Sequence, residues 1–178
     1  TNLGIANYLD GKLEVALSYH KRALAMKEMF GQKWGIANSH LSIGIILFAR
    51  GDLDSAMEMY EKSRNIWEGM GDRKTLISSI NNIGEVWLAK GEPELAMKAY
   101  SQSLSIAEQI NAKPGISSAL CGLALACIQT GDMEGAMGYA AKGLDIASEA
   151  KNTAIEGKCK CVLGIIHSKL NDFAKAEK

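Results

Sequence analysis

Apolar residues recur along the chain at three- and four-residue steps, which is the spacing of one face of an α-helix. In residues 73–90 they are Leu76, Ile77, Ile80, Ile83, Val86 and Trp87. In residues 92–110 they are Leu95, Ala96, Ala99, Tyr100, Leu104 and Ile106. The pattern predicts two helices. Gly91 between them predicts a turn, because glycine takes the left-handed conformation at a helix end without steric cost.

The residues at the ends of these stretches fit the rules for helix termini. We expect Glu92 to cap the second helix, and Pro93 fits its first turn, where no amide donor is needed. Asn111 is expected to end that helix, and Pro114 to open the next one. The chain therefore predicts a cycle of helix, short turn, helix, short turn.

The same unit recurs every forty residues. The turn positions are Gly11, Gly51, Gly91, Gly131 and Asn171. An alanine follows five residues after each one, at Ala16, Ala56, Ala96, Ala136 and Ala176. Several columns held in phase without an insertion do not arise by chance. We predict one array over residues 1–178, with a partial repeat 1–31, full repeats 32–71, 72–111 and 112–151, and a partial repeat 152–178.

Small residues stand where the two helices of each unit are expected to cross. Gly44 and Gly84 are on the first helix, and Ala56 and Ala96 are on the second. Their small side chains allow the helix axes to approach toward the ~8 Å end of the usual packing range. Leucine at such a site is expected to cost roughly 1–3 kcal/mol through overpacking.

This register resembles the tetratricopeptide repeat family. The family has a bulky and then a small residue on helix A, and an alanine on helix B twelve residues after the small one. The matching pairs are Gly4 and Ala16, Gly44 and Ala56, Gly84 and Ala96, Ala124 and Ala136, and Gly164 and Ala176. The family's helix B aromatic, four residues beyond the alanine, is matched by Tyr60 and Tyr100 and replaced by His20 and Ala140.

The period of forty departs from the family's standard thirty-four. It resembles the subclass of Pins/LGN-like scaffolds and prokaryotic signalling arrays. HEAT and armadillo repeats also have periods near forty, but they lack this glycine–alanine register. The resemblance implies an all-α fold, a right-handed superhelical solenoid of stacked antiparallel helix pairs. Both ends of the sequence fall inside a repeat, so we expect it to be part of a longer array.

In the family, helix A lines the concave face, which implies a peptide-binding groove. Carried over by register, its lining residues are Tyr8, Asn38, Leu41, Ile45, Phe48, Ser78, Asn81, Asn82, Glu85, Leu88, Ser118, Cys121, Leu125 and Ile128. An amphipathic helix or an extended peptide with apolar anchors would suit this mostly apolar set. Asn81, Asn82 and Glu85 are the best candidates for contact with a peptide backbone, since asparagine both donates and accepts hydrogen bonds. The alternative is that these side chains pack against neighbouring helices.

One subtype of the family clamps C-terminal carboxylates with lysine, asparagine and arginine. The corresponding residues are Leu41, Ile45 and Asn81, none of them basic, so such a clamp is not supported.

The composition limits the classes of partner and the cellular setting that we expect. Lys+Arg and Asp+Glu number 20 each, and without a basic surplus a nucleic-acid partner is not expected. No apolar run approaches the ~18 residues of a membrane span. Four cysteines are too few for a disulfide scaffold in a chain this long, which favours a reducing, cytoplasmic setting.

The cysteines do not predict a metal or a catalytic site. Cys159 and Cys161 are two residues apart, so on a helix they point about 200° away from each other and cannot easily share an ion. Packing is the expected role of the cysteines. Cys127 and His167 occupy the same position in adjacent repeats, but side chains at this position are expected to pack in the core. No glycine-rich phosphate loop is present. We therefore expect no cofactor, no metal and no enzymatic activity.

The function favoured by the sequence is a scaffold that binds a peptide or a helical segment of another protein in the groove. Two alternatives stay open. The array can be the regulatory or sensor segment of a larger signalling enzyme or transcription regulator. It can also be a self-associating module, because uncapped repeat ends expose apolar helix faces; light scattering over a concentration series would test this.

Overall fold

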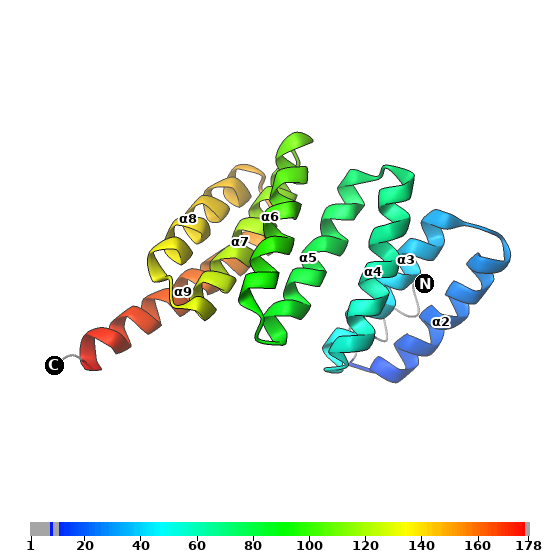
Figure 1. The fold of residues 1–178 in the computed structure, drawn as a ribbon, viewed down its shortest axis with the longest axis horizontal. Helices are drawn as coiled ribbons and strands as arrows, with labels where there is room; N and C mark the ends of the chain where they lie inside the picture. The colour runs from blue at the N-terminus through cyan, green and yellow to red at the C-terminus, as the bar shows by residue number, and fades with distance from the viewer. Residues whose placement is uncertain (1–7, 9–10, 177–178) are drawn as a thin grey trace. The chain divides into compact units, whose positions relative to one another are not determined.

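The computed structural model describes residue 8 and residues 11–176, with side chains described up to residue 170. Within these residues the secondary structure is helical, without a strand. The longer helices are α2 (Leu13–Met29), α3 (Lys33–Ala49), α4 (Leu53–Met70), α5 (Arg73–Ala89), α6 (Pro93–Gln109), α7 (Lys113–Thr130), α8 (Met133–Glu149) and α9 (Thr153–Ala176) (Figure 1). Gly4 lies outside the described residues, as do the side chains of Asn171 and Ala176.

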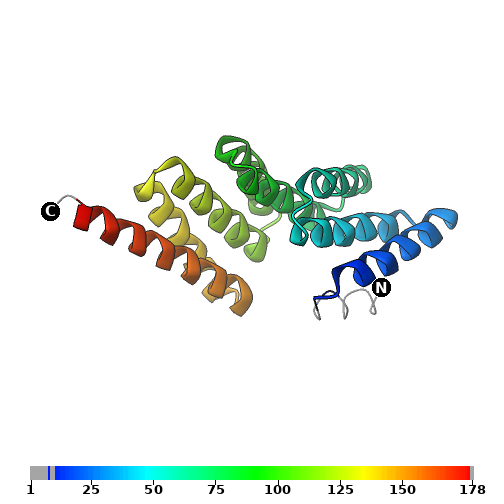
Figure 2. The same cartoon turned by 90° about the horizontal axis from the view of Figure 1, so that it is seen from below.

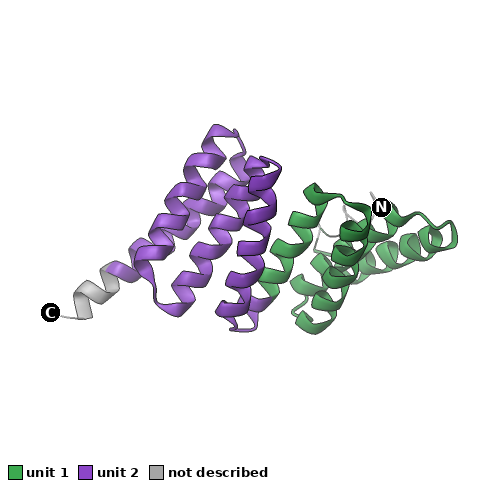
Figure 3. Ribbon diagram, turned by 45° about the horizontal axis from the view of Figure 1, so that its top comes forward, with its two compact units in different colours: residues 1–86 green, residues 87–178 purple. Residues whose placement is uncertain are grey.

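Two compact units make up the chain, residues 1–86 and residues 87–178, and the division falls inside α5 (Figure 3). In unit 1, α3 packs against both α2 and α4. In unit 2, α6 packs on α7, α7 on α8 and α8 on α9, and α7 also contacts α9. Each unit is thus a stack of consecutive antiparallel helices joined by short turns, as the ribbon seen from below also shows (Figure 2).

The helix ends follow the sequence prediction with one exception. Gly51 and Gly131 adopt positive φ angles of 82° and 85° in the turns, and Asn111 does the same at 50°. Pro93 is the first residue of α6, as predicted. Glu92 occupies the N-cap position, but its side chain makes no capping hydrogen bond, so the expectation that it caps the helix was wrong. Glutamate is not among the side chains favoured at this position.

The small residues lie where helices meet. Ala16, Ala56, Ala96 and Ala136 are fully buried. On α3, a Cβ added to Gly44 would lie 2.5 Å from Cε1 of Tyr60 on α4, and the Tyr60 side chain is itself buried. The phenol ring therefore occupies the space that the glycine leaves free, which is why the two helices can approach closely.

We expect Gly44→Ala to lower the free energy of unfolding by roughly 1–2 kcal/mol. Overpacking against Tyr60 costs about 1–3 kcal/mol, and the better helix propensity of alanine returns up to about 1 kcal/mol. The control is Gly69→Ala in α4, where an added Cβ meets nothing within 4 Å. It should stabilise the chain by about 0.5–1 kcal/mol. Urea denaturation of both variants measures this, and stabilisation by Gly44→Ala would contradict the packing argument.

Buried hydroxyl groups join the helices of a pair. In unit 1, the Ser63 hydroxyl on α4 donates to the Ala37 carbonyl on α3 at 3.0 Å. In unit 2, the direction is reversed, because the Ser117 hydroxyl on α7 donates to the Gly143 carbonyl on α8 at 2.5 Å. Each bond satisfies a polar group that would otherwise be buried without a partner.

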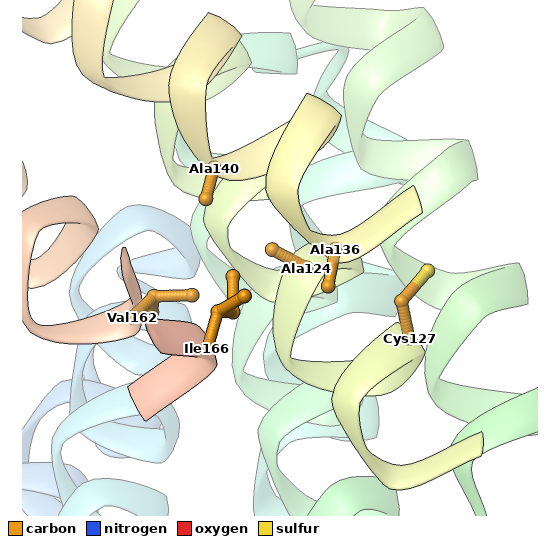
Figure 4. Close-up of a cluster of buried hydrophobic side chains, with 6 residues drawn as sticks. All are labelled: Ala124, Cys127, Ala136, Ala140, Val162 and Ile166. Carbon is orange, nitrogen blue, oxygen red and sulfur yellow. The ribbon is translucent and has the colours of Figure 1, made fainter. Parts of the chain in front are cut away.

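The core of unit 2 is built from small and branched side chains. One cluster brings together residues of α7, α8 and α9, and Figure 4 shows Val162 and Ile166 of α9 pointing toward the alanines of the other two helices. Its buried members are Ala124, Cys127, Ala136, Ala140, Val162 and Ile166. The alanines leave the space that the larger α9 side chains fill.

Candidate functional site

In unit 1, the residues predicted to line a groove differ in exposure. Ile45 and Ser78 are exposed, whereas the half-buried members are Tyr8, Asn38, Leu41, Phe48, Asn82 and Glu85. Asn81 is the outlier, with a side chain only 8 % exposed. Its Oδ1 atom accepts no hydrogen bond from the described residues. A ligand therefore reaches Asn82 and Glu85 more easily than Asn81.

The Glu85 carboxylate contributes to the electrostatics around α4. The pKa of Tyr60 is raised above its ordinary value, first by burial of the phenol and second by the charge of Glu85. The phenol is therefore neutral at physiological pH.

A small pocket of about 120 Å³ opens in unit 1, lined by Tyr8, His20, Ser42, Ile45 and Ile46. It brings two predicted groove residues, Tyr8 and Ile45, together with three that were not predicted. His20 is 2 % exposed, and its Nδ1 atom has no hydrogen-bond partner among the described residues. Burial lowers its pKa, with smaller contributions from the N-terminal charge and Lys27, so the imidazole is neutral at pH 7. The signal that pointed to His20 was its place in the aromatic column of helix B.

A second, shallower pocket of about 810 Å³ lies at the α2–α3 turn of unit 1. Its lining residues are Lys27, Gly31, Gln32, Lys33, Trp34, Gly35, Asn38, Ser42 and Met70. The Lys27 stem lies over Gly35, where a Cβ would come within 2.9 Å of its Cδ atom, and the ammonium donates to the Ser39 hydroxyl at 2.8 Å. Burial lowers the pKa of Lys27. Asn38 is the predicted groove residue in this pocket, and Ser42 is shared with the first.

In unit 2, four of the predicted groove residues are half-buried: Leu88, Ser118, Leu125 and Ile128. Leu125 and Ile128 pack against the cluster drawn in Figure 4. Leu88 packs against a second cluster that includes Ala96 and Tyr100. These three side chains therefore have a packing role, the alternative that the sequence left open.

Two cysteines depart from the sequence expectation. Cys121 was expected to line the groove, but it is fully buried and forms a disulfide with Cys159, with the two Cα atoms 5.7 Å apart. The expectation that the cysteines serve only for packing was wrong for this pair. Cys161 is exposed and free, so it points away from Cys159 as their spacing predicted.

The geometry offers no catalytic cysteine or metal cluster within the described part of the chain. Cys127 is buried, and its pKa is raised by burial and by Asp132, which keeps the thiol protonated and unreactive. His167 in the matching register is exposed. No three His, Cys, Asp or Glu side chains among the described residues come together in a metal-binding group.

None of the described helices combines the length and the apolar character that a bilayer span requires.

Comparison with known proteins identifies the repeats. Residues 35–109 match the family model described as tetratricopeptide repeat. No curated protein sequence matches the chain.

Solved structures share the fold at low identity. Aspartyl phosphate phosphatase F from Bacillus subtilis is 14% identical with a TM-score of 0.85, covering 99% of this chain and 46% of that one. A Rap protein in complex with competence and sporulation factor is 16% identical with a TM-score of 0.84, covering 97% and 48%. A putative kinesin light chain with TPR-like repeats from Podosopora anserina is 14% identical with a TM-score of 0.75, covering 99% and 87%.

This chain spans about half the length of the first and second of these structures. Similarity at such identity concerns the fold, and it agrees with the stacked helix pairs and the buried alanine column. Residues 35–109 therefore match the model of the tetratricopeptide repeat family, and the chain has the fold of tetratricopeptide-type helical solenoids.

Proposed function

We propose that the chain is a non-catalytic scaffold that binds a peptide or helical segment of a partner protein on the helix A side of unit 1. The observation that carries the proposal is the mixture of accessible apolar and polar positions there. Ile45 is exposed beside a pocket, and Asn82 and Glu85 on α5 are half-buried. Apolar side chains supply contact area, while the amide and the carboxylate fix the position of a main chain.

Two similar structures support a peptide as the ligand. One is a Rap protein complexed with competence and sporulation factor, and another is the Rap conjugation gene regulator of plasmid pLS20 in complex with the Phr* peptide. A protein or peptide partner also agrees with the balanced charge of the chain, 20 basic and 20 acidic residues, which gives no basic surplus for nucleic acid.

The proposal predicts that Asn82→Ala with Glu85→Ala weakens peptide binding. Two lost hydrogen bonds of about 0.5–1.5 kcal/mol each correspond to a loss of affinity of roughly tenfold or more. Peptides selected from a random phage-displayed library against the natural chain serve as ligands, and isothermal titration calorimetry measures their Kd. The melting temperature should change little, because both side chains are half-buried.

A matched control exists on α4. Asn65→Ala with Glu68→Ala changes the same residue types at the same spacing, and both side chains are exposed. This control should bind the selected peptides as the natural chain does. Equal loss of binding in both double variants would count against a site on the helix A side. A loss of binding that is accompanied by a clearly lower melting temperature would also count against it.

A second candidate is a regulatory segment of a larger signalling protein. It is favoured because this chain covers 46% of aspartyl phosphate phosphatase F and 48% of the Rap protein, so further elements accompany the matching array in those proteins. The full coding sequence decides between the two, since a neighbouring enzymatic or DNA-binding domain would favour the regulatory role. A cytoplasmic location is part of the same proposal. Disulfides are rare in that reducing compartment, so thiol titration of the chain isolated under non-reducing conditions tests whether Cys121 and Cys159 are bonded there.

A further inference from the structure

A lysine occupies a position of helix B that is apolar and fully buried in the following repeats. Lys27, Trp67, Ala107 and Ala147 stand forty residues apart, and the last three are fully buried. Lys27 is half-buried instead and lines the pocket at the turn between α2 and α3 (Figure 1). Withdrawing a charge from water costs free energy that an apolar side chain does not cost, so packing alone does not account for this lysine.

The Lys27 ammonium has no counter-ion among the described residues. One of its three N–H donors goes to the Ser39 hydroxyl at 2.8 Å, and the structure gives the other two no partner there. Burial alone lowers the pKa of Lys27, whereas a neighbouring carboxylate would raise it. The side chain is therefore a half-buried cation that an anion from outside can pair with.

The surface beside Lys27 is basic and has an apolar wall. The pocket lining includes Lys27 and the exposed Lys33 but no aspartate or glutamate, and every lining residue is among those that the structure describes. Trp34 and Met70 supply apolar surface and are 61 % and 42 % exposed. Exposed apolar side chains bordered by polar groups are typical of interaction sites. A ligand with a negative charge next to an apolar group complements this surface.

Both main groups of this surface are held in place by the fold. The Trp34 ring meets the buried Trp67 ring edge to face, with centroids 6.0 Å apart. The Lys27 stem lies over Gly35, where an added Cβ would come within 2.9 Å of its Cδ atom. A ligand therefore meets an indole and an ammonium that are already positioned, which lowers the entropy cost of binding.

We propose that Lys27, Lys33, Trp34 and Met70 form a site for an acidic side chain and an adjoining aromatic side chain of the bound peptide. The carboxylate pairs with Lys27, where its charge strengthens the hydrogen bond, and the aromatic ring packs on Trp34 and Met70. The inference rests on the proposed function, because α3 is a helix A of unit 1 and carries the predicted groove residue Asn38 in the same pocket. It adds the charge and the chemical class of the peptide.

The first test uses hydrocinnamate, a carboxylate joined to a phenyl ring by two methylene groups, and its neutral amide. Both are titrated into the ¹⁵N-labelled chain, and NMR follows the Trp34 indole N–H and the amides of Lys33, Gly35 and Met70. We expect millimolar binding of the carboxylate and roughly tenfold weaker binding of the amide, because the amide lacks the charge-assisted bond. Equal affinity for the two compounds, or no shifts at these residues, overturns the proposal.

The variant Lys27→Met separates a binding role from a structural one. It keeps an unbranched side chain over Gly35 and removes the charge, so hydrocinnamate should bind roughly tenfold more weakly. The melting temperature should stay the same or rise, because the position becomes apolar as in the later repeats. Lys98→Met, at an exposed lysine of α6, is the control and should bind normally. Undiminished binding in a folded Lys27→Met chain overturns the proposal, and so does a lower melting temperature with unchanged selectivity for the carboxylate.

A second variant tests the apolar wall. Trp34→Ala keeps both lysines and removes an exposed ring, so the test survives if Lys27→Met fails to fold. It should weaken the binding of hydrocinnamate and of its amide by the same factor, because both compounds carry the phenyl ring. Unchanged affinity in the Trp34→Ala chain overturns the placement of the aromatic group.

Selected peptides separate this inference from the proposed function. Peptides selected against the natural chain should carry aspartate or glutamate beside an aromatic residue, and those selected against Lys27→Met should lose this feature. If peptides bind but lack it, the scaffold function stands and the acidic-peptide site falls. If hydrocinnamate binds beside Lys27 while no peptide binds the array, the scaffold function falls. Binding of phosphatidylserine vesicles that Lys27→Met abolishes, without any peptide binding, assigns this surface to a membrane and overturns both.

Discussion

Trp67→Ala is expected to lower the free energy of unfolding by about 3–5 kcal/mol, the range for large-to-small changes at a buried tryptophan. The Trp67 side chain is fully buried near the end of α4. Its ring meets Trp34 of α3 edge to face, with centroids 6.0 Å apart, and its Nε1–H donates to the Ser63 hydroxyl at 3.0 Å. The substitution therefore removes ring contacts and a buried hydrogen bond together.

The Ser63 hydroxyl explains why the hydrogen bond matters. Its one proton goes to the Ala37 carbonyl, so the Ser79 hydroxyl 3.1 Å away must be the donor in their contact. Trp67 and Ser79 then occupy both acceptor sites of Ser63. Loss of the indole leaves one of these buried sites empty, which costs about 1–3 kcal/mol. Trp67→Phe, which keeps most of the ring, should isolate this smaller loss.

Urea denaturation followed by circular dichroism measures these differences. Trp34→Ala is the control for the aromatic pair, because Trp34 is 61 % exposed and loses mainly the edge-to-face contact. That contact is worth about 0.5–1.5 kcal/mol. If Trp34→Ala destabilised the chain as much as Trp67→Ala, the assignment of the stability to the buried ring and its hydrogen bond would be wrong.

The helices could be predicted from the sequence because their determinants are local and repeated. The three- and four-residue apolar steps placed α5 and α6 to within a residue of their observed ends. The alanine column was also predictable, since Ala56 and Ala96 are small at the crossing points for a steric reason that recurs in every copy. Glu92 shows the limit, because the N-cap position was found correctly while the capping bond itself is absent.

Side-chain accessibility could not be predicted in the same way. A register position tells which side of a helix a residue occupies, but not how far the neighbouring helix covers it. Asn81 and Asn82 are adjacent in the sequence, yet only Asn81 is buried. The pocket at His20 brings together side chains from different helices, among them Ser42 of α3, so it required the coordinates.

The Cys121–Cys159 pair escaped prediction for a related reason. The two residues are 38 positions apart, two short of the repeat period, so no column places them together. They meet because α7 and α9 stack directly on each other. Gly143 of α8 lies beside the bond, and a Cβ there would be in van der Waals contact with both sulfur atoms at 3.4 Å.

Reduction of this disulfide is expected to lower the free energy of unfolding by about 4 kcal/mol, the loop-entropy value for a closed loop of this length. The loop spans a sequence separation of 38 residues and ties α7 to α9. For a chain of this size, each kcal/mol changes the melting temperature by about 2–4 °C. Thermal unfolding with and without a phosphine reductant should therefore show a decrease of roughly 8–16 °C.

The variant Cys121→Ala/Cys159→Ala separates the disulfide from other effects of the reductant. Its melting temperature should not respond to reductant, because the remaining thiols of Cys127 and Cys161 are free in the natural chain. Both bonded cysteines are fully buried, so an attacking thiolate reaches them only after local opening, and reduction should be slow below the melting transition. Thiol titration in denaturant completes the test: two reactive thiols per unreduced chain agree with the bond, whereas four would show that Cys121 and Cys159 pack together as thiols.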